Sequence, residues 1–138
     1  MNAARITTVL VTFIGGSCAD SRSAALGERL FKGDAPLTGR LSGDPTLLPV
    51  GATRCSNCHD AAGSDAATFG PPLTAKTLLS PRKRRGGPLS QYDLESFCAV
   101  LRKGVDPTFI VIDRAMPRYE LNDESCKALW NYVRSRSR

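Results

Sequence analysis

The stretch Cys55-Ser56-Asn57-Cys58-His59 decides how the rest of this chain is interpreted. Two thiols three residues apart lie on one face of a helical turn, with Cβ atoms about 5–6 Å apart. They can therefore form thioethers with the two vinyl groups on neighbouring edges of a porphyrin, and the following imidazole lies under the ring. The C-x-x-C-H spacing is typical of covalent haem attachment. We expect one covalent haem c, held by Cys55 and Cys58, with His59 as an axial ligand of the iron.

The N-terminus has the layout of a signal peptide. Residues 1–5 carry one positive charge, residues 6–14 are apolar, and small residues follow up to Ala19. This order of charged, apolar and small residues is typical of a secreted precursor. We interpret 1–19 as a signal peptide cleaved after Ala19 and 20–138 as a single domain. A periplasmic location follows from this interpretation.

Two membrane interpretations compete with export alone. The first is lipid attachment at Cys18, which is disfavoured because Gly15 stands where a lipoprotein signal usually has Leu. The second is a membrane span, for which the N-terminal apolar stretch is too short. The longest strongly apolar run elsewhere is 110–112, so we expect no span in the mature chain.

The cysteine count agrees with export. Cleavage removes Cys18, haem attachment uses Cys55 and Cys58, and Cys98 and Cys126 are left over. An oxidising compartment allows the last two to form a disulfide. The alternative is a pair of buried free thiols that pack as small hydrophobes.

Residues 81–88, Pro-Arg-Lys-Arg-Arg-Gly-Gly-Pro, form the densest positive run of a chain with net charge +6. Nucleic acid is not an expected partner of an exported protein. The cations at 82–85 predict either a docking patch for an acidic redox partner or a clamp on the haem propionates. A solvated loop without a function is the alternative.

Three stretches have helical periodicity, namely 24–32, 94–101 and a helix that starts near Asn122. Ser90 and Asp93 fit a capping box before the second helix, and the Arg-rich end of the third is expected to fray. Gly27 lies inside the first helix, either because another helix crosses there or because it is simply tolerated.

The connecting segments differ in their patterns. Residues 33–54 are rich in Gly and Pro and predict a long loop. Residues 107–112 are apolar and β-branched, so we expect a short extended segment packed on the core.

Two further segments supply candidate residues for the haem. A proximal His needs an acceptor for its second ring nitrogen, and the carbonyl of Pro71 or Pro72 could provide it. Once the signal is removed, the chain has one His and one Met, so His59 and Met116 are the available His/Met pair of iron ligands. Met116 as an ordinary core residue is the alternative. Pro117 stiffens the loop that carries it.

Taken in order, these features resemble class I cytochromes c, the monohaem type that bacteria export. The resemblance rests on motifs spread over most of the mature chain: Gly27 with Phe31, Cys55-x-x-Cys58-His59, Gly70-Pro71-x-Leu73, Met116-Pro117, and Leu129 with Tyr132. It implies an all-α fold of roughly three to five helices wrapped around one covalent haem, with long loops. It also implies that the first and last helices cross, that the Pro71 carbonyl bonds the proximal imidazole, and that Met116 is the distal ligand. The stretch 33–54 is an insertion before the haem motif.

The function implied is one-electron transfer to and from a redox partner, not catalysis. One alternative is a haem-bearing subunit of a periplasmic oxidoreductase complex, and another is a small-ligand-binding cytochrome with a labile distal ligand. A thiol–disulfide oxidoreductase using Cys55 and Cys58 is the most distant, because the chain lacks the βαβ pattern that such enzymes have.

Overall fold

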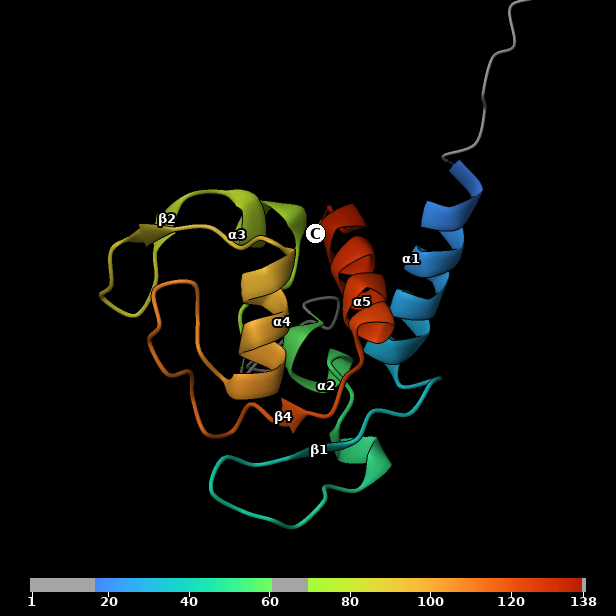
Figure 1. Cartoon of the computed structure of the whole chain (residues 1–138), viewed down its shortest axis with the longest axis horizontal. Coiled ribbons are helices and arrows are strands. Elements are labelled where there is room, and N and C mark those ends of the chain that lie inside the picture. Colours follow the sequence, from blue (N-terminus) through green and yellow to red (C-terminus); the bar gives the residue numbers. More distant parts are fainter. Residues whose placement is uncertain (1–16, 61–69, 138) are drawn as a thin grey trace, which may run out of the picture.

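The computed structural model describes residues 17–60 and 70–137, so the predicted signal segment up to residue 16 lies outside it. The described residues are mainly helical, as the sequence predicted (Figure 1). Their helices are α1 (Ser17–Lys32), α2 (Ser56–His59), α3 (Ala75–Leu79), α4 (Leu94–Lys103), α5 (Asp123–Ser135) and the 3-10 turn η1 (Val50–Ala52). Antiparallel pairs of two-residue strands join β1 (Gly39–Arg40) to β4 (Arg118–Tyr119) and β2 (Arg82–Lys83) to β3 (Leu89–Ser90).

The first and last helices, α1 and α5, pack against each other along one side of the molecule (Figure 1). Gly27 is buried where they cross, and a Cβ added there would overlap the carbonyl oxygen of Ala128. Next to the crossing, the rings of Phe31 and Tyr132 lie 5.4 Å apart between centroids. Of the two interpretations of Gly27, the close helix crossing is therefore correct.

Helix α1 begins at Ser17, earlier than the predicted start at residue 24, and so crosses the predicted cleavage point. Asp20 in its first turn favours the positive end of the helix dipole. Ser23 Oγ accepts a hydrogen bond of 3.1 Å from Asn131 Nδ2 of α5. The part of α1 before residue 24 is held by polar contacts. It therefore has no apolar periodicity from which its helical structure could be predicted.

The second predicted helix is present as α4, but its cap differs from the prediction. Asp93 is the N-cap, and its carboxylate accepts a hydrogen bond of 2.8 Å from the backbone N–H of Ser96. Ser90 lies in β3 instead, so the predicted capping box was wrong by one turn. Helix α4 ends at Gly104, whose φ of 71° closes the last turn.

Helices α4 and α5 share a core contact and a covalent link. The rings of Phe97 and Trp130 lie 5.2 Å apart between centroids. A disulfide joins Cys98 to the fully buried Cys126 and closes 28 residues of chain. This pair lies away from the haem motif, in the packing of the two helices.

The prediction of an extended, core-packed segment at 107–112 holds only for its end, where Val111 pairs with Val105 in an antiparallel bridge and Ile112 packs in the core. Residues 107–109 form a turn built around Asp106, whose Oδ1 accepts hydrogen bonds from the backbone N–H groups of Thr108 and Ile110. Phe109 at its tip is 86% exposed, and Ile112 is buried. The carboxylate of a residue just outside the apolar run decided the local structure, because it satisfies backbone donors that a strand would otherwise need to pair.

The prediction that the Arg-rich C-terminus frays is wrong at Arg136, whose side chain is 15% exposed. Its guanidinium lies 4.3 Å from the ring centroid of Phe31 and pairs with Asp60 at 3.0 Å. Its carbonyl accepts a hydrogen bond from the N–H of Ala75. Arg136, directly after α5, thus contacts α1 and the residue after the haem motif.

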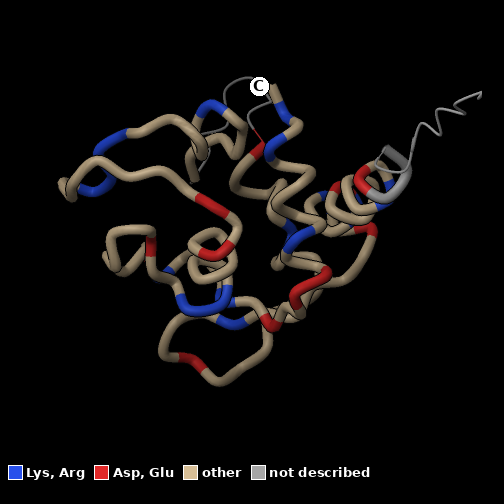
Figure 2. Tube along the Cα trace, turned by 45° about the horizontal axis from the view of Figure 1, so that its top comes forward, with Lys and Arg blue, Asp and Glu red and all other residues tan. Residues whose placement is uncertain are grey.

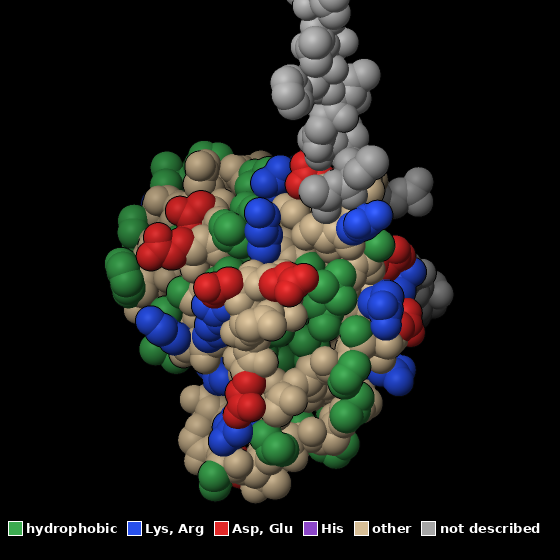
Figure 3. Space-filling model, turned by 45° about the vertical axis from the view of Figure 1, so that its right-hand side comes forward, with side chains coloured by type: hydrophobic (Ala, Val, Ile, Leu, Met, Phe, Trp, Pro, Cys, Tyr) green, Lys and Arg blue, Asp and Glu red, His purple; other side chains and the backbone are tan. Residues whose placement is uncertain are grey.

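One face of the molecule is of mixed charge. Figure 3 shows acidic and basic side chains interspersed with small apolar groups on the face that it presents. Within residues 17–60 and 70–137, none of the helices has the length and apolarity that crossing a bilayer would require.

Candidate haem-binding site

Helix α2 presents the C-x-x-C-H residues. Cys55 is its N-cap, and the N–H groups of Cys58 and His59 both donate to the Cys55 carbonyl, at 3.2 and 3.0 Å. Neither Cys55 nor Cys58 is in a disulfide. Cys55 and His59 are buried and Cys58 is half-buried. One short turn of backbone therefore holds both thiols and the imidazole together.

The ring of His59 is fixed from behind. Its Nδ1–H donates a hydrogen bond of 2.7 Å to the carbonyl of Pro71, which leaves Nε2 as the nitrogen available to a metal. The carbonyl of Pro72, the other candidate, accepts from Thr77 Oγ1 at 2.6 Å instead. A Cβ at Gly70 would overlap the His59 ring, so this position must be glycine for the ring to lie where it does.

A cavity of about 350 Å³ opens beside the motif, and Cys55, Cys58 and His59 line it. A second cavity of about 300 Å³ adjoins it. The residues that line both are His59, Pro71, Arg85, Ile112 and Met116. Each is within the size range of small-molecule and cofactor sites. Met116 thus lies at the same site as Cys55, Cys58 and His59, although it is distant from them in the sequence.

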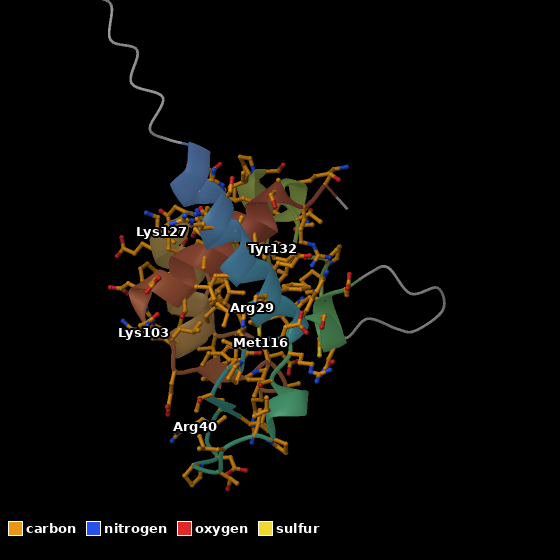
Figure 4. The ribbon with its side chains drawn as sticks, turned by 90° about the vertical axis from the view of Figure 1, so that its right-hand side faces the viewer. Arg29, Arg40, Lys103, Met116, Lys127 and Tyr132 are labelled. Carbon is orange, nitrogen blue, oxygen red and sulfur yellow. A yellow bond between two sulfur atoms is a disulfide. The ribbon has the colours of Figure 1, made fainter. Side chains whose placement is uncertain are left out.

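Met116 reaches the cavity from the loop before β4, and Figure 4 shows it at the level of α2. It is half-buried and packs against the hydrophobic core. Arg118 lies behind this loop and donates hydrogen bonds to the carbonyls of Met116 and Ile112, at 2.6 and 3.3 Å. The loop is therefore held by the side chain of its own C-terminal neighbour.

The segment 33–54, predicted as a loop, forms a wall of the first cavity through Leu41, Leu48 and Ala52. It is fastened there by the pairing of β1 with β4 and by an ion pair between Arg40 and Glu120. The insertion before the haem motif therefore covers the site and connects to the strand that follows Met116.

Burial governs the protonation of the groups in the cavity. It raises the pKa of the Cys55 thiol to about 12. It also raises the pKa of Tyr119, whose hydroxyl donates to the Thr53 carbonyl at 3.1 Å. Burial lowers the pKa of His59, the Pro71 carbonyl raises it, and the charge of Arg136 lowers it. A neutral imidazole is the form that binds a metal, and a thiol with so high a pKa is a poor nucleophile for disulfide exchange.

The basic run at 82–85 divides into two groups. Arg84 bonds inward, donating to the carbonyls of Thr77 at 2.9 Å and of Ser90, and its guanidinium lies 4.9 Å from the ring centroid of Tyr92. Arg82, Lys83 and Arg85 are exposed at the hairpin of β2 and β3, on the side of the molecule away from α1 (Figure 2). All four line the second cavity.

Sequence reasoning missed three residues that shape the site, Arg118, Tyr119 and Arg136, and named Gly70 only as part of a motif, without its contact with the His59 ring. Each acts through a contact with a backbone group, a ring or a carboxylate that the sequence pattern does not identify. Gly70 alone had a local signal, its place in the Gly-Pro motif.

The comparison with known families agrees with this arrangement. The family model for cytochrome c matches residues 49–137, more than half of the chain. The chain belongs to the cytochrome c family. The match does not include α1 or most of the segment 33–54. The crossing of α1 with α5 is therefore evidence that is independent of the family match. No curated protein and no solved structure matches the chain significantly.

Family membership implies covalently bound haem c, and the residues present fit that group. Two unpaired thiols at the required spacing open onto a cavity of suitable size, and the adjacent His59 has its Nδ1 occupied by Pro71. The chain is therefore an electron-transfer protein of the haem-binding type.

Proposed function

We propose that this protein is a class I, monohaem cytochrome c, exported to the periplasm, that carries single electrons with His59 and Met116 as the axial iron ligands. The observation that supports it best is that His59 and Met116 line the same two cavities, next to Cys55 and Cys58. The signal-peptide layout of 1–19 supports export, with cleavage after Ala19.

When bound, haem supplies a one-electron couple between ferrous and ferric iron. The residues of the chain bind and orient the haem. Cys55 and Cys58 hold the porphyrin by thioethers, and His59 offers Nε2 to the iron while its Nδ1–H stays on the Pro71 carbonyl at 2.7 Å. Met116 offers a soft thioether, a ligand that raises the reduction potential. With His59 and Met116 both available as ligands, the chain would need little rearrangement during electron transfer.

Apolar side chains form much of the wall of the site. Leu41, Leu48 and Ile112 line the first cavity, and Phe97 and Leu101 line the second. An apolar surrounding disfavours the extra charge of ferric haem and so also raises the potential. The segment 33–54 contributes to this wall, which gives the insertion a function.

The partner is proposed to be acidic at its docking face. Arg82, Lys83 and Arg85 lie on the hairpin that forms a wall of the second cavity. Leu89 in the same hairpin and Phe109 in the facing turn are 66% and 86% exposed. Exposed cations around exposed apolar side chains, next to the haem, suit a short-lived contact guided by charge.

The experiment that tests the ligation uses protein matured with haem in a bacterial periplasm. We expect haem that stays with the polypeptide in acid acetone, a sharp α-band when reduced, and a weak near-infrared band when oxidised. Met116→Ala should abolish the near-infrared band and leave the haem covalently bound. An unchanged oxidised spectrum of this variant would refute Met116 as the ligand.

The same sample separates the alternatives. A small-ligand-binding cytochrome would take up CO or cyanide readily at neutral pH, and a subunit of an oxidoreductase complex would copurify with a catalytic chain. For a simple carrier we expect slow ligand uptake and purification as a separate protein.

The docking face is tested with small redox probes of opposite charge. Replacing Arg82 and Lys83 by Gln should slow oxidation by anionic hexacyanoferrate and speed reduction by cationic hexaammineruthenium, both effects shrinking with salt. Lys127→Gln, on the exposed face of α5, is the control and should change both rates less. Equal effects at both places would refute a localised docking face.

A further inference from the structure

The side chain of Arg118 turns back toward the loop that precedes it. Nη1 donates to the carbonyl of Met116 at 2.6 Å and Nη2 to the carbonyl of Ile112 at 3.3 Å. One planar guanidinium therefore bridges the two ends of the segment 112–116. Hydrogen bonds from a charged donor are stronger than those between neutral groups.

The guanidinium of Arg118 packs against the backbone of Gly104 at the end of α4. A Cβ at Gly104 would overlap its guanidinium, so the end of α4 leaves room for it only because that residue is glycine. The carbonyl of Gly104 also accepts a hydrogen bond of 2.9 Å from the N–H of Ile112. Helix α4 is in turn joined to α5 by the Cys98–Cys126 disulfide. The loop that carries Met116 is thus held against the end of α4, a helix that is covalently joined to α5.

Arg118 acts from outside the cavity. Its neighbours Pro117 and Tyr119 line the first cavity, and Arg118 is not among the lining residues of either cavity in the described chain. Arg118 therefore contacts the site only through the loop, and its charge is the one other way in which it can act on the iron. The backbone of that loop contributes one more bond, from the N–H of Met116 to the carbonyl of Asp113 at 3.3 Å.

We propose that Arg118 is a positioning residue that keeps Met116 in the conformation that can bind the iron. This rests on the proposed function, in which Met116 is the distal ligand. A thioether is a weak ligand, so its occupancy depends on how large a fraction of the loop conformations present the sulfur to the iron. The two carbonyl bonds restrict the loop to those conformations.

The test is an imidazole titration of the oxidised holoprotein at fixed pH, because imidazole competes with Met116 for the iron. Arg118→Gln should raise the apparent affinity for imidazole about tenfold, since fewer loop conformations then oppose the competitor. The weak near-infrared band should fall in parallel. An imidazole affinity equal to that of the wild type would overturn the proposal.

Arg102→Gln is the matched control. Arg102 also donates to a backbone carbonyl, that of Leu121 at 3.0 Å, and pairs with Asp123 at 2.6 Å, but both of these partners lie outside the loop 112–116. Its loss should leave the imidazole affinity unchanged. A rise equal to that of Arg118→Gln would reduce the effect to general loosening and overturn the proposal.

Arg118→Lys separates the bridge from the charge. A lysine keeps the positive charge but lacks the planar fork that reaches two carbonyls at once. We expect it to recover only part of the wild-type resistance to imidazole. If Arg118→Lys had the full wild-type resistance to imidazole, the positive charge alone would be sufficient to position Met116. That result would overturn the proposed role of the two hydrogen bonds.

Met116→Ala distinguishes failure of this inference from failure of the proposed ligation. With its ligand removed, the protein should bind imidazole more tightly than any Arg118 variant. If Met116→Ala binds it no more tightly than the wild type, the ligation itself is wrong. If Met116→Ala binds tightly and Arg118→Gln does not change the affinity, only the role of Arg118 is wrong.

Discussion

Gly27 of α1 faces the carbonyl oxygen of Ala128 in α5, and a Cβ built on Gly27 would overlap this oxygen and lie 2.7 Å from the Cβ of Tyr132. The obstacle is partly backbone, which cannot rotate away as a flexible side chain can. The two helices therefore cross at a separation that only glycine allows at this position.

Gly27→Ala should lower the free energy of unfolding by about 1–3 kcal/mol, the usual cost of overpacking. The gain in helix propensity from Gly to Ala, about 1 kcal/mol, opposes this loss. Urea denaturation followed by circular dichroism measures it. Gly51→Ala is the control, because no atom lies within 4 Å of the added Cβ, and it should change the midpoint little. Equal midpoints for both variants would contradict the close crossing.

The Cys98–Cys126 disulfide should stabilise the fold by about 2–4 kcal/mol, because it closes 28 residues of the unfolded chain. The double variant Cys98→Ala with Cys126→Ala should lose that amount in urea denaturation. Its haem spectrum should be unchanged, since neither cysteine lines either of the two cavities at the haem motif. A wild-type midpoint that does not move under thiol reductant would contradict this prediction.

Arg136→Gln should destabilise the protein by about 2 kcal/mol, because it removes the ion pair with Asp60 and the stacking on Phe31. The measurement is the urea midpoint. Arg134→Gln is a matched control in the same helical end, where the cation is exposed and lies 5.6 Å from the Trp130 ring centroid. Arg134→Gln should lower the free energy of unfolding clearly less than Arg136→Gln does. Equal decreases for the two variants would mean that the contact with Asp60 contributes nothing to stability.

Asp106 should make the folded protein sensitive to acid. Burial raises the pKa of Asp106, but hydrogen bonds from Thr108 and Ile110 and the charge of Arg85 outweigh it and hold the pKa below its ordinary value of 3.8. The unfolded carboxyl therefore takes up its proton at a higher pH than the folded one. Its stabilising contribution is present above about pH 4 and is lost as the pH falls through the folded pKa.

Asp106→Asn should for this reason be less stable than the wild type at pH 7, and the difference should shrink below pH 4. Urea midpoints at pH 7, 5, 4 and 3 measure it. Asp34→Asn, at an exposed carboxylate, serves as the control and should change the midpoint little at any pH. A difference that stays constant down to pH 3 would contradict the prediction.

Membership of the cytochrome c family and the all-α fold class followed from local sequence, and the family match and the structure confirm these two predictions. Covalent haem attachment needs two thiols and an imidazole within one turn of backbone, so five consecutive residues specify it. The main helices were found because an apolar stripe repeats at helical spacing. Their ends were predicted less well, because caps such as that of Asp93 depend on which of several polar residues bonds the backbone.

Tertiary structure decided the surroundings of the haem motif. The residues alone left Pro71 and Pro72 open as the acceptor for His59, and only the resemblance to cytochromes c pointed to Pro71, which accepts the hydrogen bond. The place of the segment 33–54 on the cavity wall and the contacts of Arg118 could not be predicted from sequence. Neither could the contact between Arg136 and Asp60, which are 76 positions apart. The physical reason is that helical periodicity and the attachment motif are properties of neighbouring residues, whereas a carbonyl or carboxylate gains its partner only when distant segments pack together.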